Sequence, residues 1–327
     1  MSDLVSILIP IYNAEKWLRK TICCAVEQTW SNKEVIIVDD GSTDGSLAIA
    51  RQFERSDVKV ISQENQGACV ARNRGLAEAQ GDFVQFLDSD DLMNRNKIEL
   101  QVKRLRAETP GTLASGKWER FYDSSGSFAN SEVTFNTKSY YRDYEYGLEW
   151  ALVAASRKGM FPPHAWLVPR SVTEKIGSWD ESLLINQDGE YFNRAVLASS
   201  GVAFCEGAKV YYRSGMKDSI SQRKDPAALR SKYQSIRQIA DQILEEENSP
   251  RTREACAIAF QAFAYGAYPD VPRYVEQAIR KAEKPSGSQD YRPGGSDLYQ
   301  RLHDLLGWRA AKLLRRWYYQ LRYDQKI

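Results

Sequence analysis

The chain has 327 residues, of which 43% are hydrophobic and 27% are charged, and its formal net charge is +2. This composition is typical of a soluble globular protein with one large domain or two ordinary ones. So small a net charge implies no polyanionic partner, and no nucleic acid is expected. The chain has only two histidines, and its five cysteines form no CxxC pair, which argues against a zinc site of Cys/His type.

The N-terminal segment MSDLVSILIPIYN lacks the basic region of a signal peptide. No stretch approaches the roughly 20 apolar residues that a membrane span requires. The cysteines resemble buried thiols of a reducing compartment. We therefore expect a cytoplasmic protein that is at most attached peripherally to the inner face of the membrane.

Strands and helices alternate along the first part of the chain. Four apolar runs are predicted to be buried strands: 4–11, 34–40, 58–62 and 83–87. Helices are predicted between them, the first of them capped by Asn13. This alternation predicts an α/β fold with βαβ units and a doubly wound, Rossmann-like sheet that is mixed but mostly parallel.

The pattern is looser after residue 112. A hairpin is predicted over 116–128, and a short strand, a helix, a loop and another helix over 167–201. Residues 227–283 have helical patterns broken at Pro250 and Pro269, and 284–297 form a flexible linker. We expect a first domain over 1–225 and a helical C-terminal region over 226–327.

Three acids follow the last predicted strand of the sheet directly, in the segment GDFVQFLDSDDLM. Asp88, Asp90 and Asp91 could form a turn with a helix cap, or a divalent-cation site shared with a phosphate ligand. Doubly wound sheets bind ligands at the carboxyl ends of their strands, where Tyr12 and Asp39 also lie. This convergence favours the ligand site.

Four segments, in this order, resemble the motifs of the family 2 glycosyltransferases: VSILIPIYNAEKWLRKTI, VIIVDDGSTDGS, NQGACVARNRGLAEAQGDFVQFLDSDD and INQDGEYFNR. The resemblance covers roughly residues 3–225 and implies the GT-A fold. It also implies an enzyme that moves a sugar from a nucleotide-sugar donor, here a UDP-sugar, to an acceptor hydroxyl. The implied acceptor is a saccharide or a lipid-linked saccharide in cell-surface polysaccharide or glycan synthesis.

The resemblance assigns nucleotide-binding roles to residues at the strand ends. It places Pro10 and Tyr12 in the segment that flanks the base, and it makes Asp39 the acceptor of a hydrogen bond from the base, typically uracil. Asp40 is expected to support the turn or the ribose, and Arg72 to reach the nucleotide.

The acids Asp88-Ser89-Asp90 correspond to the DxD motif of the family. The resemblance implies that Asp88 and Asp90 bind Mn²⁺ or Mg²⁺, that Ser89 lies with them at the donor, and that the cation bridges the diphosphate. Such a cation would cancel the repulsion between the two carboxylates and stabilise the leaving group.

Asp188 in NQDGE aligns with the general base that the family is proposed to use. The residue before it is Gln187 where the family has Glu. A carboxylate there can take the proton of the attacking hydroxyl, and attack opposite the diphosphate inverts the anomeric centre. Alternatively Asp188 caps a helix, with Glu190 as the next candidate base. Trp179 is a candidate acceptor-side residue or a core residue.

The terminal segment is predicted to be a basic amphipathic helix. Its apolar stripe comprises Leu306, Ala310, Leu313, Leu314, Trp317 and Leu321. Such a helix suits an anionic membrane surface, but it could also pack on the helical region or on a second subunit of a homodimer.

One alternative from another functional class stays open. The chain could be a catalytically inactive nucleotide-binding protein on a GT-A scaffold, whose C-terminal helices recruit a partner. Absence of donor hydrolysis and of transfer, with intact nucleotide binding, would distinguish it from an enzyme.

Overall fold

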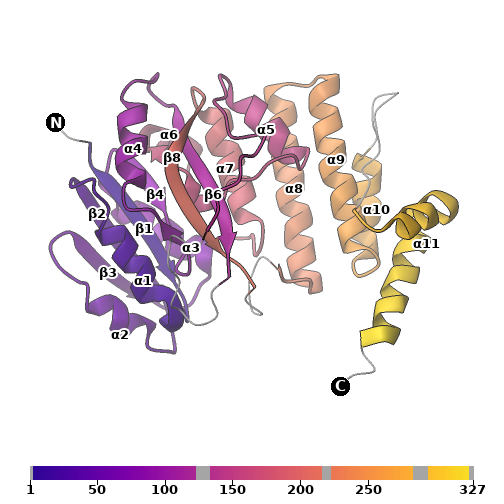
Figure 1. Cartoon of the computed structure of the whole chain (residues 1–327), viewed down its shortest axis with the longest axis horizontal. Coiled ribbons are helices and arrows are strands. Elements are labelled where there is room, and N and C mark those ends of the chain that lie inside the picture. The colour runs from indigo at the N-terminus through magenta and orange to yellow at the C-terminus, as the bar shows by residue number, and fades with distance from the viewer. Residues whose placement is uncertain (1–2, 123–132, 216–221, 283–293, 324–327) are drawn as a thin grey trace.

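The computed structural model describes residues 3–122, 133–215, 222–282 and 294–323 (Figure 1). Its main sheet has the strand order β3-β2-β1-β4-β7. The first four of these strands are parallel, and β7 is antiparallel to β4. The strands are β1 (Val5–Ile11), β2 (Lys33–Asp40), β3 (Val58–Gln63), β4 (Phe83–Phe86) and β7 (Val168–Pro169). The predicted mixed, mostly parallel sheet is confirmed.

Helices connect the parallel strands, as the alternating pattern predicts. They are α1 (Glu15–Val26), α2 (Ser46–Arg51) and α3 (Ala68–Glu78), and α4 (Lys97–Leu105) follows the sheet's fourth strand. The predicted cap of α1 is wrong: Ala14 occupies the N-cap position, and Asn13 Oδ1 instead accepts a hydrogen bond from the backbone N–H of Thr43 (2.8 Å). Asn13 therefore joins the loop after β1 to the loop after β2.

A second sheet, of order β5-β8-β6, lies beside the first. It comprises β5 (Leu92–Met93), β6 (Leu113–Phe121) and the long β8 (Val202–Arg213). The first arm of the hairpin predicted over 116–128 is the end of β6, which pairs in parallel with β8. The turn and the second arm of that prediction lie largely outside the described residues.

The remaining helices follow in the second half of the chain, and most of them lie on the side of the molecule away from the main sheet (Figure 1). These are α5 (Gly147–Ala155), α6 (Arg170–Ile176), α7 (Gln187–Ala198), α8 (Pro226–Glu246), α9 (Pro250–Ala267) and α10 (Pro272–Lys281), with a 3-10 turn, η2 (Pro163–Ala165), before β7. Asp225 caps α8 by accepting from the N–H groups of Ala227 and Ala228. One hydrophobic core contains Tyr191 together with Ile236 and Phe263, so it is continuous across the predicted boundary at residue 225.

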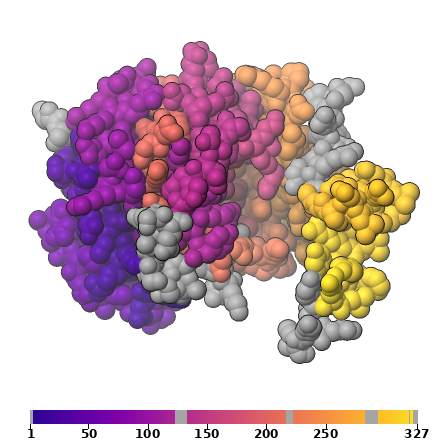
Figure 2. All heavy atoms as spheres, viewed as in Figure 1, coloured from indigo at the N-terminus to yellow at the C-terminus, as the bar shows by residue number. Residues whose placement is uncertain are grey.

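The terminal helix α11 (Asp297–Tyr323) is kinked at Gly307, which has a φ of 78°. After the kink it lies against α9 and α10: Trp308 packs on Tyr268 at 5.4 Å between ring centroids, and Arg316 pairs with Asp270 (2.7 Å). Figure 2 shows the helix at one edge of the molecule.

The apolar stripe predicted for this helix faces away from the body of the protein. Leu313, Leu314, Trp317 and Leu321 are all at least 42% exposed. Basic side chains of the helix contact α9 and α10 instead: Lys312 donates to the carbonyl of Gly266 (2.9 Å), and Arg309 pairs with Glu276 (2.5 Å). Among the described helices, none combines the length and the apolar character that crossing a bilayer requires.

Candidate functional site

Residues 88–91 form a turn at the carboxyl end of β4, which we call the acid turn. The hydroxyl of Thr21, buried in α1, donates to the carbonyl oxygens of Ser89 (2.9 Å) and Asp91 (3.0 Å). The backbone N–H of Asp91 donates to the carbonyl of Asp88 (3.1 Å). These bonds fix the backbone of the turn without any ligand. The sequence analysis did not identify Thr21 as a residue of the site. The only sign of it in the sequence is that a polar residue lies on the apolar face of a helix.

Arg213, at the end of β8, supports the acid turn from the other side. Its Nε donates to the carbonyl of Asp90 (2.8 Å), and its backbone N–H donates to Asp91 Oδ1 (2.6 Å). The guanidinium lies over the rings of Trp17 (4.0 Å) and Phe121 (4.4 Å). Buried in this way, Arg213 positions the turn rather than presenting its charge to solvent.

The third acid of the turn, Asp91, is a buried structural residue. Its Oδ2 lies 3.2 Å from Nδ1 of His164, which is also buried. Burial raises the pKa of Asp91 and lowers the pKa of His164 to about 3, so burial disfavours the charged form of each. Asp88 and Asp90 are the acids of the turn that remain partly exposed.

Asp88 and Asp90 are the carboxylates of the turn that could hold a cation together with a ligand. Burial and the negative charge of Asp88 raise the pKa of Asp90 to about 6. A bound cation would remove that repulsion. Among the described residues no group of three or more His, Cys, Asp or Glu side chains could hold a metal. Two carboxylates leave positions for phosphate and water oxygens, which is common for Mg²⁺.

Arg72 of α3 connects the acid turn to the start of α7. Its Nη2 pairs with Asp88 Oδ1 (2.8 Å). With the side-chain amide of Gln187 in the orientation that satisfies both of its ends, Gln187 accepts from Arg72 Nη1 (3.1 Å) and donates to the carbonyl of Leu184 (2.9 Å). The residue that departs from the family motif thus contacts the arginine of another motif.

Trp179 supports Arg72 from beneath. The guanidinium lies 4.5 Å from the centre of the Trp179 ring, and that ring stacks on Tyr191 at 4.1 Å. Trp179 is 1% exposed, so the structure corrects its assignment to the acceptor side. It is a core residue because aromatic rings and the arginine cover it.

Asp188 is the second residue of α7, and the N-cap position of that helix belongs to Asn186. Asp188 is therefore not the helix cap. Burial raises its pKa, while Arg72 and the N–H of Gly189 lower it and the charge of Asp88 raises it further. The charges of Arg72 and Asp88 both shift the pKa of Asp188, so the predicted base lies close enough to the acid turn to feel its charges.

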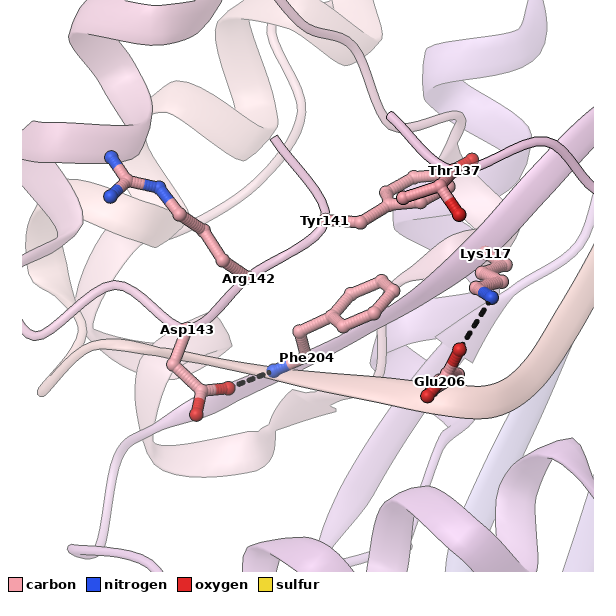
Figure 3. A pocket seen from close by; sticks show the side chains of 7 residues that line it. All are labelled: Lys117, Thr137, Tyr141, Arg142, Asp143, Phe204 and Glu206. Atoms are coloured by element: carbon pink, nitrogen blue, oxygen red, sulfur yellow. Dashed lines mark hydrogen bonds and ion pairs between the residues drawn. The ribbon is translucent and has the colours of Figure 1, made fainter. Parts of the chain in front are cut away.

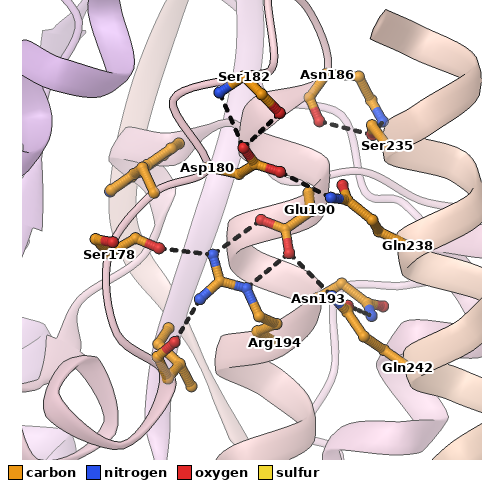
Figure 4. Close-up of polar contacts among 12 residues, drawn as sticks. Ser178, Asp180, Ser182, Asn186, Glu190, Asn193, Arg194, Ser235, Gln238 and Gln242 are labelled. Atoms are coloured by element: carbon orange, nitrogen blue, oxygen red, sulfur yellow. Dashed lines mark hydrogen bonds and ion pairs between the residues drawn. The ribbon is translucent and has the colours of Figure 1, made fainter.

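Glu190, the second candidate base, is engaged in hydrogen bonds within the protein. Its carboxylate is buried and accepts from Arg194 Nε (2.7 Å) and Nη2 (2.9 Å), and from Gln242 Nε2 of α8 (2.9 Å) (Figure 4). Both oxygens are occupied by internal donors. This leaves Asp188 as the better placed of the two carboxylates.

Asp39 and Asp40 end β2 in different environments. Asp39 is 1% exposed; its Oδ2 accepts from Ser62 Oγ (3.2 Å), and its buried Oδ1 has no hydrogen-bond partner within the described parts of the chain. Asp40 accepts from the N–H groups of Gln66 (3.0 Å) and Gly67 (2.7 Å) and so supports the turn. A buried acceptor without a donor, as in Asp39, is what a nucleobase N–H could satisfy.

The register of β1 brings the other two predicted nucleotide residues beside Asp39. Ile11 pairs with Asp39, so Pro10 and Tyr12 flank that position. Tyr12 is 50% exposed at the strand end. The predicted residues of β1 and β2 therefore lie together at the carboxyl edge of the sheet.

A separate cavity of about 430 Å³ lies along β6 and β8 (Figure 3). Lys117 and Glu206 form an ion pair across it (2.7 Å), and Tyr141 stacks on Phe204 at 5.0 Å. None of the motif residues lines this cavity. It is distinct from the site at the acid turn.

The chain resembles known proteins in sequence and in fold. The sequence model described as "Glycosyl transferase family 2" matches residues 6–177, more than half of the chain. The glycosyltransferase GlyG of Streptococcus pneumoniae is 38% identical over 131 residues, which are 39% of this chain and 43% of that protein.

An Escherichia coli relative is named as the UDP-Glc:alpha-D-GlcNAc-diphosphoundecaprenol beta-1,3-glucosyltransferase WfgD. It is 36% identical over 137 residues, which are 41% of this chain and 54% of that protein. The chain spans about half the length of these two curated relatives.

Two solved structures have similar folds. Residues 1–349 of TarS from S. aureus, in complex with UDP-GlcNAc, align with a TM-score of 0.65 at 18% identity and cover 95% of this chain and 91% of that one. The mannosyltransferase PcManGT of Pyrobaculum calidifontis, in complex with GDP-Man and Mn²⁺, aligns with a TM-score of 0.57 at 16% identity, covering 100% of this chain and 89% of that one.

Proposed function

The chain belongs to the family 2 glycosyltransferases, and from that premise we propose that it transfers one sugar from a UDP-sugar to a hydroxyl of a saccharide or lipid-linked saccharide. The reaction inverts the anomeric centre, and its product enters a cell-surface polysaccharide or glycan. One observation carries the proposal: Arg72 pairs with Asp88 of the acid turn and contacts Gln187, the neighbour of Asp188.

The donor nucleotide binds at the carboxyl edge of the main sheet. Asp39 accepts the hydrogen bond of the base through its buried Oδ1, because that oxygen has no donor within the described chain. Pro10 and Tyr12 flank the base, and Ser89 lies beside the diphosphate. The name of WfgD and the ligand of the TarS structure support a uridine nucleotide, whereas the PcManGT structure contains GDP-Man.

Asp88 and Asp90 would hold the divalent cation, Mn²⁺ or Mg²⁺, together with oxygens of the diphosphate. When bound, such a cation supplies Lewis-acid stabilisation of the charge that develops on the leaving group. Thr21 and Arg213 keep the two carboxylates in place, since their hydrogen bonds fix the backbone of the turn.

Asp188 acts as the general base. It takes the proton of the acceptor hydroxyl while the hydroxyl oxygen forms a bond to the anomeric carbon. The bond from that carbon to the diphosphate oxygen breaks, and its electron pair leaves with the nucleoside diphosphate. Attack from the opposite face inverts the centre, as in inverting hydrolysis with the acceptor in place of water.

A binding screen tests the proposal. Melting temperatures are measured with UDP, GDP, UDP-glucose and UDP-GlcNAc, each with Mn²⁺ and with EDTA, and release of UDP is then assayed. A ligand that binds only the native state stabilises it by RT ln(1 + [L]/Kd), so UDP with Mn²⁺ should raise the melting temperature most. Preference for GDP would contradict the donor assignment. Binding without UDP release or transfer would favour the inactive scaffold.

A further inference from the structure

One face of α8 carries a polar stripe directed at the segment before α7. Ser231, Ser235, Gln238 and Gln242 recur at the spacing of a single helical face. Ser231 and Ser235 are buried, at 3% and 0% exposure. Burying polar groups is unfavourable unless they are hydrogen-bonded, and an apolar stripe would pack α8 without that cost. The side chains of the stripe therefore need specific hydrogen-bond partners.

The two serines bond to the backbone of three consecutive residues. Ser231 Oγ accepts from the N–H groups of Leu184 (2.7 Å) and Ile185 (3.3 Å). Ser235 Oγ donates to the carbonyl of Asn186 (3.0 Å) and accepts from the Asn186 side-chain amide (Figure 4). Without these hydroxyls, the backbone groups of a part-buried loop would lose their partners.

Asn186 is held in an uncommon backbone conformation directly before the predicted base. Its φ of 58° lies in the left-handed region, which is unfavourable for most residues and tolerated by Asn. Gly189 accommodates its side chain, since a Cβ at that position would meet Asn186 Oδ1 at 2.9 Å. The direction in which Gln187 and Asp188 leave the loop depends on this conformation.

The glutamines of the stripe hold the flanks of the same segment. Gln238 Nε2 donates to Asp180 Oδ2 (2.7 Å). Gln242 donates to Glu190 (2.9 Å) and accepts from Asn193 (2.8 Å), one turn and two turns into α7. The stripe thus contacts the segment on both sides of Asp188.

We propose that Ser231 and Ser235 are positioning residues for Asp188, which makes α8 part of the catalytic apparatus rather than of a separate domain. This rests on the proposed function, in which Asp188 is the base. Neither serine touches the donor or the acceptor. They act through the backbone of 184–186, which they hold in the conformation that presents Asp188 to the acceptor.

The test compares the Ser231→Ala/Ser235→Ala double variant of the full chain with wild type and with Ile243→Val. Ile243 is a fully buried residue of the same helix, so its shortening controls for a general loss of packing. Two quantities are measured: amide hydrogen exchange of residues 180–188, and the kcat and KM of UDP release from UDP-glucose and UDP-GlcNAc with Mn²⁺.

We expect the amides of Leu184 and Ile185 to exchange at least tenfold faster in the double variant, while Ile243→Val leaves them unchanged. The kcat should fall at least tenfold, with a smaller change in KM, because the base does not bind the nucleotide. Unchanged exchange overturns the proposal, and so does faster exchange with a kcat equal to that of Ile243→Val. If wild type releases no UDP, the proposed catalytic function fails, and the exchange data still decide whether the serines hold the loop.

Discussion

Arg72 and Asp88 form an ion pair, with 2.8 Å between Nη2 and Oδ1, that joins α3 to the acid turn. Burial raises the pKa of Asp188, and the same guanidinium, which contacts Gln187, partly offsets that rise. The positive charge of Arg72 therefore stabilises both Asp88, which we assign to cation binding, and Asp188, which we assign as the base. Replacing it would disturb donor binding and the base together, so the predictions below change the carboxylates one at a time.

Asp39→Ala should weaken UDP binding. The variant removes a buried acceptor whose hydrogen bond to the base contributes about 1–3 kcal/mol, because the acceptor is charged. Calorimetric titration with UDP and Mn²⁺ measures the loss. Asp57→Asn, a surface change at the opposite end of the sheet, is the control. Equal UDP affinity in wild type and Asp39→Ala would remove Asp39 from the site.

Asp88→Asn and Asp90→Asn should each abolish the gain in UDP affinity that Mn²⁺ provides. Wild type is expected to bind UDP at least tenfold more tightly in Mn²⁺ than in EDTA, because Asp88 and Asp90 would hold a cation that offsets the negative charge of the diphosphate. In the variants the two affinities should converge. The same titrations measure this ratio. A wild-type ratio near one would show that nucleotide binding needs no cation.

Asp188→Asn keeps the size of the side chain and removes the proton acceptor. UDP affinity should stay within about twofold of wild type, whereas transfer should fall by roughly 10²–10⁴-fold, the usual range for loss of a general base. Single-turnover transfer assays and calorimetry on one purified variant measure both.

Glu190→Gln is the matched control for that variant. Glu190 pairs with Arg194 and Gln242, so its replacement should lower the melting temperature. Its transfer rate should fall much less than that of Asp188→Asn. A stable Asp188→Asn protein with nearly wild-type transfer would eliminate the base assignment.

The pH dependence of kcat should report the raised pKa of Asp188. The base works deprotonated, and burial raises its pKa above the ordinary value of about 3.9. Activity is therefore expected to be complete above this raised pKa and to be lost as pH falls through it. A profile of kcat at saturating donor, from pH 4 to 8, measures the midpoint. A midpoint at or below about 4 would contradict the burial of the acting base.

The outward stripe of α11 should bind an anionic lipid surface. Leu314, Trp317 and Leu321 are exposed, and the helix also has exposed basic residues, among them Arg315 and Arg316. Full-length protein is expected to float with vesicles of phosphatidylcholine and phosphatidylglycerol at low salt, and less so at high salt. A chain ending at residue 296 and a Leu314→Ser/Trp317→Ser/Leu321→Ser variant should not float.

Two outcomes would argue against the lipid assignment. Retention of the full-length protein in the soluble fraction would make α11 a packing element. Concentration-dependent dimers that the triple substitution abolishes would indicate a second copy of the chain as the occupant of the stripe.

The sequence by itself was enough to predict the parallel strands of the main sheet and the family to which the chain belongs. Buried strands such as Val5–Ile11 are continuous apolar runs, and strand-end acids such as Asp39 and Asp88 follow them directly. These signals are local: a few neighbouring residues carry both the strand and the chemistry at its end. The order of four such motifs was enough to predict the fold, the site and the proposed roles.

Only the tertiary structure decided what lies against each predicted residue. Arg213 bonds to Asp91 across 122 positions of sequence, and Ser231 bonds to Leu184 across 47. Trp179 looked equally suited to an acceptor surface or to the core. Helical and strand periodicity report which face of an element is buried but not which residues cover it. The stripe of α8, the engagement of Glu190 and the outward face of α11 therefore appear only when distant segments pack together.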